Sequence, residues 1–274
     1  MGDTRQSSRK TRSSRQISTN HQENHPQDHW SKLAHSNYQS TVIKNRVHVW
    51  VLPLSLSQST YGGRKTPSSA CALISLHIAH DFMTQKIPMP STSSQDSQSL
   101  PLAVLETVIN GIVDGNKSHE TAMADLKKRE RLSKDKVNKC EGVRRYFKPD
   151  RDAFTLREAI QVHRKCYLVD QRTYSGHFIK NLVTAMTMVA TSPYLCEVDR
   201  LPMVVSAFGR AVCIIFTRKQ PQSIMLLDSH MHLKGRAGSV LCGASFENIE
   251  HFTAIVTKLV FREVFDAVQF TGVI

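Results

Sequence analysis

The spacing of apolar residues changes along the chain, and this change restricts the fold more than any other feature. In the first half, ALISLHIAHDF and LAVLETVINGIV carry apolar residues at helical spacing. The last third instead holds short β-rich runs between turn signals: LPMVVSAF, AVCIIFTR, SIMLLDSH and AGSVLCGA. Helices followed by consecutive strands predict an α+β domain in which a helical N-terminal part packs on a C-terminal antiparallel sheet.

The chain divides into a polar tail and one domain. Residues 1–45 are rich in Ser, Gln, Asn, His and Arg, so burial cannot offset the entropy of ordering them, and we expect a disordered basic tail. The run VHVWVLPL then predicts the first strand of a domain over residues 46–274. Three histidines in the tail are four positions apart, but their neighbours do not favour a helix, so no metal site is expected at His21, His25 and His29.

Helix boundaries follow from capping signals. Thr66-Pro67 is a suitable helix start, which would place Cys71 in the first turn. The next helix is expected to end at Gly115-Asn116. Thr155 and Glu158 have the spacing of a capping box and predict a third helix.

Composition limits the partners and the compartment. The six cysteines are scattered without a C-x-x-C pair, which disfavours disulfides and structural zinc and favours a reducing compartment, cytoplasmic or nuclear. No apolar run is long enough to span a membrane, and the N-terminus lacks the apolar region of a secretory signal. The Gly62–Lys65 loop lacks the phosphate-binding pattern. We therefore expect no membrane association, no cofactor and no metal.

The net charge of +13 raises the question of nucleic acid. Basic residues crowd Lys127–Lys148, but acidic residues are interleaved at helical spacing, which is typical of a solvated helix. No aromatic platform accompanies them. Nucleic-acid binding through this cluster is therefore possible but not favoured.

Cys71 is the candidate nucleophile. A helix N-terminus stabilises a thiolate, and its free N–H groups can stabilise an oxyanion. The alternative is that Cys71 is a small buried residue of the core, which is the usual role of a free cysteine.

Asp228 and His230 are the candidate base pair. They are two positions apart at the end of a strand, so both side chains can face one site, where the carboxylate would orient the imidazole. His232 continues the same face and could replace His230. The alternative is a structural turn in which Asp228 and Ser229 satisfy backbone N–H groups.

Ser-Ala-Cys at a helix start and the later Leu-Leu-Asp-Ser-His resemble the papain-like deubiquitinating peptidases, and most of all the herpesvirus large tegument protein type. The resemblance covers about 40 residues in two boxes. It implies a papain-like fold in which Cys71 is the nucleophile, His230 the base and Asp228 the residue that orients it. It also implies ubiquitin or a ubiquitin-like protein as the partner.

The chain departs from that family in two places. The family's Asp-Pro-His is Asp-Ser-His here, and Gln58 is the oxyanion candidate although its surroundings do not match. The leading hypothesis is a cysteine hydrolase that cleaves a peptide or isopeptide bond at a ubiquitin-type C-terminus. The alternatives are a non-catalytic interaction module on the same fold and a basic nucleic-acid-associated protein.

Overall fold

The computed structural model describes residues 38–92, 99–137, 152–165, 171–175, 177–193, 198–218, 222–261 and 269–273. The chain separates into residues 1–35 and 36–274, and all described elements belong to the second unit. Disorder in the expected tail lies outside the described residues, as do the three tail histidines.

The first strand, β1, lies inside the range expected to be tail. It runs over Gln39–Ile43 and pairs antiparallel with β2 (Val47–Val51), which is the first strand that the sequence predicted. The side chains of β1 are mostly exposed, so backbone pairing orders this segment with little burial. Hydrophobic pattern does not detect such a strand, and the boundary expected at residue 46 is therefore too late.

In the described part of the chain the sheet has eight strands, and every pairing between them is antiparallel. Their order across the sheet is β1-β2-β7-β6-β5-β4-β8-β3. The sequence predicted four of them in the last third, and each is present: β4 (Arg200–Ala207), β5 (Arg210–Thr217), β6 (Ser223–Asp228) and β7 (Val240–Ser245). The expected α+β class with an antiparallel sheet is confirmed.

Two further strands at one edge were not predicted. They are β3 (Gln171–Ser175) and β8 (Gln269–Val273), which pair with each other, while β8 also pairs with β4. Neither short segment shows an alternating pattern strong enough to be read from sequence.

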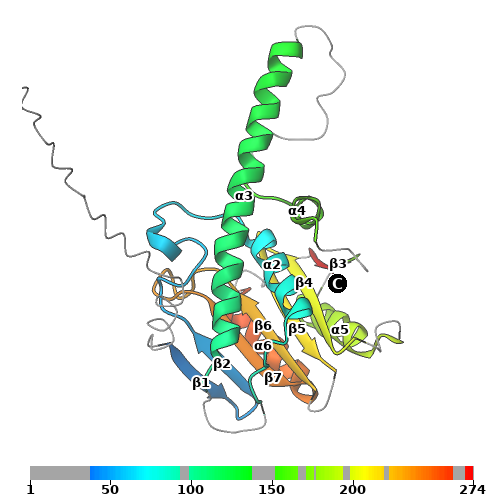
Figure 1. Cartoon of the computed structure of the whole chain (residues 1–274). Helices are drawn as coiled ribbons and strands as arrows, with labels where there is room; N and C mark the ends of the chain where they lie inside the picture. The colour runs from blue at the N-terminus through cyan, green and yellow to red at the C-terminus, as the bar shows by residue number, and fades with distance from the viewer. Residues whose placement is uncertain are drawn as a thin grey trace, which may run out of the picture. The chain divides into compact units, whose positions relative to one another are not determined.

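Helices cover both faces of the sheet (Figure 1). On one face α2 (Cys71–Thr84) packs against β4 and β5, and it also contacts α3 (Leu102–Val137) and α4 (Leu156–His163). On the other face α5 (Phe178–Thr191) and α6 (Ile249–Leu259) share a core with alternate residues of the central strands. The central strands are therefore buried on both sides, which explains their continuous apolar runs.

The start of α2 differs from the sequence prediction. The helix begins at Cys71, with Ala70 rather than Thr66 at the N-cap. Before it, the Ser68 hydroxyl accepts a hydrogen bond from the Ala70 N–H and donates one to Asn116 of α3. These bonds compete with helix formation, so the loop continues up to the cysteine.

The predicted end of α3 is also wrong, because the helix continues through Gly115-Asn116 to Val137. A Cβ atom built on Gly115 would lie 2.7 Å from the Cα of Ile74 in α2. The glycine is thus required for close packing of two helices rather than for ending one. By contrast, the predicted capping box of α4 is confirmed, since Thr155 and Glu158 exchange both bonds.

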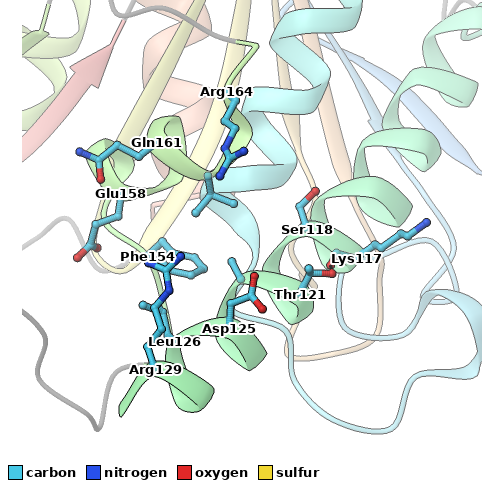
Figure 2. A pocket seen from close by; sticks show the side chains of 12 residues that line it. Lys117, Ser118, Thr121, Asp125, Leu126, Arg129, Phe154, Glu158, Gln161 and Arg164 are labelled. Atoms are coloured by element: carbon cyan, nitrogen blue, oxygen red, sulfur yellow. Dashed lines mark hydrogen bonds between the residues drawn. The ribbon is translucent and has the colours of Figure 1, made fainter. Parts of the chain in front are cut away.

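A groove of about 530 Å³ lies between α3 and α4 (Figure 2). Its lining combines apolar side chains with charges of both signs: Phe154, Leu126, Val162, Lys117, Asp125, Arg129, Glu158 and Arg164. Arg129 belongs to the predicted basic cluster, whose side chains beyond residue 129 lie outside the described part of the chain. The groove includes none of the predicted site residues.

Candidate active site

Cys71 is the first residue of α2 and is 8% exposed. At this position the N–H groups of the first helical turn have no partner within the helix, and the helix dipole favours negative charge. The backbone of Ala211, at the start of β5, also forms a hydrogen bond to the sulfur that favours its ionised form. The local structure therefore suits a thiolate.

Ala211 lies beside a tight turn between β4 and β5. Phe208 and Gly209 have φ of 53° and 72°, and they join the paired residues Ala207 and Arg210. Two residues with positive φ give the turn that matches the twist of an antiparallel hairpin. The apolar runs of β4 and β5 predicted the two strands. Nothing in the sequence indicated that the backbone of β5 meets Cys71.

His230 lies between the thiol and Asp228. Its Nδ1 is 2.5 Å from Oδ1 of Asp228, and its side chain also forms a hydrogen bond with Cys71. Because Nδ1 is engaged by the carboxylate, Nε2 is the nitrogen left to meet the sulfur. The structure thus brings together the three residues that the sequence suggested, although they come from α2 and from the end of β6.

Asp228 is the last residue of β6, and its side chain is fully buried. Its Oδ1 also accepts a hydrogen bond from the backbone N–H of His230 at 3.1 Å, which fixes the bend between the two residues. Burial raises the pKa of the carboxyl, but the charge and hydrogen bond of His230, with those of His232, hold it well below its usual range. Asp228 is therefore ionised.

The surroundings of Cys71 and His230 favour a charged pair. Burial lowers the pKa of His230, but the charge and hydrogen bond of Asp228 and the contact with Cys71 outweigh burial and raise it to about 9. Burial likewise raises the pKa of the Cys71 thiol, while His230 and Ala211 lower it below its ordinary value. At neutral pH this arrangement favours a thiolate beside an imidazolium.

Gln58 lies next to the site in a structural position. Its Nε2 donates to the Ser68 carbonyl at 2.8 Å, and its Oε1 accepts from the Ser229 hydroxyl at 2.8 Å. Its backbone N–H donates to the Ser229 carbonyl, also at 2.8 Å. Gln58 thus connects the loop before Cys71 to the residue between Asp228 and His230, and its role as an oxyanion donor stays a prediction.

Asn116 is a site residue that the sequence did not predict. Its Nδ2 donates to the Gln58 carbonyl at 3.0 Å, and its Oδ1 accepts from the Ser68 hydroxyl at 2.5 Å. The sequence places Asn116 at a helix end, and no local signal assigns it to the site. It joins α3 to both loops that position the candidate nucleophile.

His232 does not occupy the place of His230. Its Nε2 is 2.7 Å from Oδ2 of Asp228, the oxygen opposite the one that His230 contacts. The imidazole that meets the Cys71 thiol is that of His230.

Metal sites and membrane-spanning helices were also considered in the sequence. Within the described ranges, no group of three His, Cys, Asp or Glu side chains is arranged to hold a metal ion. None of the helices in those ranges is both long and apolar enough to cross a membrane.

Comparison with known proteins adds little. The chain matches no protein-family profile and no curated protein sequence, so the resemblance to herpesvirus deubiquitinases has no support from sequence comparison. Among solved structures it is similar to the crystal structure of the Pseudomonas avirulence protein AvrPphB. The TM-score is 0.39 and the identity 14%, over 74% of this chain and 89% of that chain. Likeness at this level supports no conclusion about activity, so function has to be argued from the site itself.

Proposed function

We propose that this protein is a cysteine hydrolase that cleaves a peptide or isopeptide bond. The observation that carries the proposal is the series of side-chain hydrogen bonds that joins Cys71 to His230 and His230 to Asp228. An isolated core cysteine has no need of an imidazole oriented by a carboxylate, whereas a nucleophile does.

In the proposed reaction, the Cys71 sulfur attacks the carbonyl carbon, and the carbonyl electrons move onto oxygen. The N–H groups at the start of α2 stabilise this oxyanion. His230 then gives its proton to the leaving amine, which departs as the C–N bond breaks and a thioester remains. Water attacks the thioester while His230 accepts its proton, and this step releases the acid and restores the thiolate.

We further propose that the substrate is the C-terminus of ubiquitin or a ubiquitin-like protein. This part depends on the two sequence boxes around Cys71 and His230 that resemble papain-like deubiquitinases. The proposed compartment, cytoplasm or nucleus, depends on the scattered cysteines.

The first experiment tests hydrolase chemistry. The full chain is treated with a broad epoxide inhibitor of cysteine peptidases, and labelling is mapped by mass spectrometry. We expect modification of Cys71 and its loss in Cys71→Ser, while Cys166→Ala serves as the matched control. Cleavage of a mixed peptide library should fall by at least about a thousandfold in Cys71→Ser. Equal labelling or cleavage in Cys71→Ser would remove the basis of the proposal and favour a non-catalytic interaction module.

The second experiment tests the substrate. Ubiquitin and ubiquitin-like proteins with a C-terminal electrophile are offered to wild type and to Cys71→Ser. A covalent adduct formed only by the wild type supports the proposed partner. If the epoxide labels Cys71 but no such adduct forms, the hydrolase proposal stands and the ubiquitin proposal is wrong.

A further inference from the structure

The Asp228 carboxylate contacts a second histidine that the proposed reaction does not use. His232 is 6% exposed, and its Nε2 lies 2.7 Å from Oδ2 of Asp228. Asp228 is thus enclosed between two imidazole rings, with His230 on Oδ1 and His232 on Oδ2.

The other ring nitrogen of His232 also faces an acceptor. Its Nδ1 lies 3.2 Å from the carbonyl oxygen of Leu259, the last residue of α6. A carboxylate and a carbonyl can only accept hydrogen bonds, and a neutral imidazole has a single N–H. Any neutral form of His232 would direct a lone pair at one of these oxygens, whereas the doubly protonated ring satisfies both.

Two further features favour a positive charge at this position. The last carbonyl groups of a helix have no partner within the helix, and the C-terminus of α6 attracts cations. In addition, the Cys71 thiolate, the His230 imidazolium and the Asp228 carboxylate together carry one net negative charge. A cationic His232 brings this buried group to neutrality, which lowers the cost of burying it.

The backbone holds His232 in place. Its N–H donates to the Ala237 carbonyl at 3.0 Å, and the Ala237 N–H donates back at 3.2 Å. The backbone of His232 is therefore fixed by bonds that do not depend on its own side chain, while the ring contacts Asp228 and the end of α6.

We propose that His232 is a cationic positioning residue, which fixes the Asp228 carboxylate between two histidines and attaches it to the C-terminus of α6. It acts through Asp228 rather than on substrate. Its relevance to catalysis rests on the proposed function of Cys71 and His230.

A second cation on Asp228 has a predictable effect on His230. Because two like charges share one carboxylate, each weakens the hold of that carboxylate on the other. Without the charge on His232, His230 should keep its proton to a higher pH and become a poorer acid for the leaving amine. Among the described residues, Cys242 also faces the Asp228 charge, and because burial and this charge raise the pKa of its thiol, it stays neutral.

The test is an NMR titration of the full chain with isotope-labelled histidine, read at the imidazole nitrogens. In the wild type we expect His232 to give the doubly protonated pattern at pH 7. In His232→Gln, which keeps a neutral donor toward Asp228, we expect the titration midpoint of His230 to rise by about one pH unit. The control is His48→Gln, a buried histidine that stacks on Trp50, and it should leave that midpoint unchanged.

Each outcome decides the matter. A neutral tautomer of His232 at pH 7, or an unmoved His230 midpoint in a folded His232→Gln, overturns the proposal. If the variant does not fold, the wild-type spectrum alone decides. Cys71→Ser separates the two proposals. If the titration midpoint of His230 is the same in Cys71→Ser as in the wild type, the hydrolase proposal loses its basis. The protonation state of His232 is measured from its own signals and is judged separately.

Discussion

His163 offers a quantitative test of how α4 is held against the helix that carries Cys71. It is the last residue of α4, and its ring centroid lies 4.3 Å from that of His77 and 5.7 Å from that of His80, both in α2. The residue is 8% exposed, and neither of its ring nitrogens has a hydrogen-bond partner in the described part of the chain. Burial and the charges of His77, His80 and Lys165 lower its pKa to about 4.

The direction of the pH effect follows from this shift. In the unfolded chain His163 takes up a proton near pH 6.5, whereas the folded protein resists protonation until about pH 4. The part of the folding free energy that depends on an uncharged His163 is therefore fully present above pH 6.5. It is lost as the pH falls toward 4. Integrating the difference in bound protons gives a loss of about 3 kcal/mol between pH 7 and pH 4 from His163 alone.

Replacing His163 by Phe should remove this loss. Phenylalanine keeps the ring against His77 but has no nitrogen to satisfy and no proton to bind, so we expect a gain of about 1–3 kcal/mol in the free energy of unfolding at pH 7. The advantage over wild type should widen by about 3 kcal/mol at pH 4. Urea unfolding at pH 4, 5, 6 and 7 measures both quantities.

His163→Gln is the matched control, because it cannot titrate but still buries polar atoms. It should flatten the pH dependence without the gain at pH 7. Parallel pH curves for wild type and His163→Phe would refute the reasoning, since they would show that His163 binds protons equally in both states.

Two other predictions concern the packing of α2 and the chemistry of the site. Gly115→Ala should destabilise the fold by about 1–3 kcal/mol despite better helix propensity, because the new Cβ meets the Ile74 backbone at 2.7 Å. Gly111→Ala, whose Cβ would lie 2.5 Å from the Ile78 side chain but 3.5 Å from the nearest backbone atom, should cost less than Gly115→Ala in the same thermal melts. Hydrolysis should fall near pH 9, as His230 loses its proton. A rate that continues to rise above pH 9 would contradict the charged pair.

Local pattern was sufficient for much of the fold. The apolar runs of β4 to β7 and the capping box at Thr155 are properties of short segments, so they could be read without knowing what packs against them. The order of helices before strands then indicated the α+β class. The nucleophile and its base could be suggested for a similar reason, because a helix start and the end of a strand are local positions with known chemistry.

The sequence by itself determined the strands β2 and β4 to β7, the presence of the main helices and which side chains could carry the chemistry. Only the tertiary structure decided that α2 begins at Cys71, because the bond between Ser68 and Asn116 holds the preceding loop out of the helix. It alone placed His232 between Asp228 and the end of α6. These features depend on contacts between segments far apart in the chain, and neither hydrophobic period nor capping preference encodes such contacts.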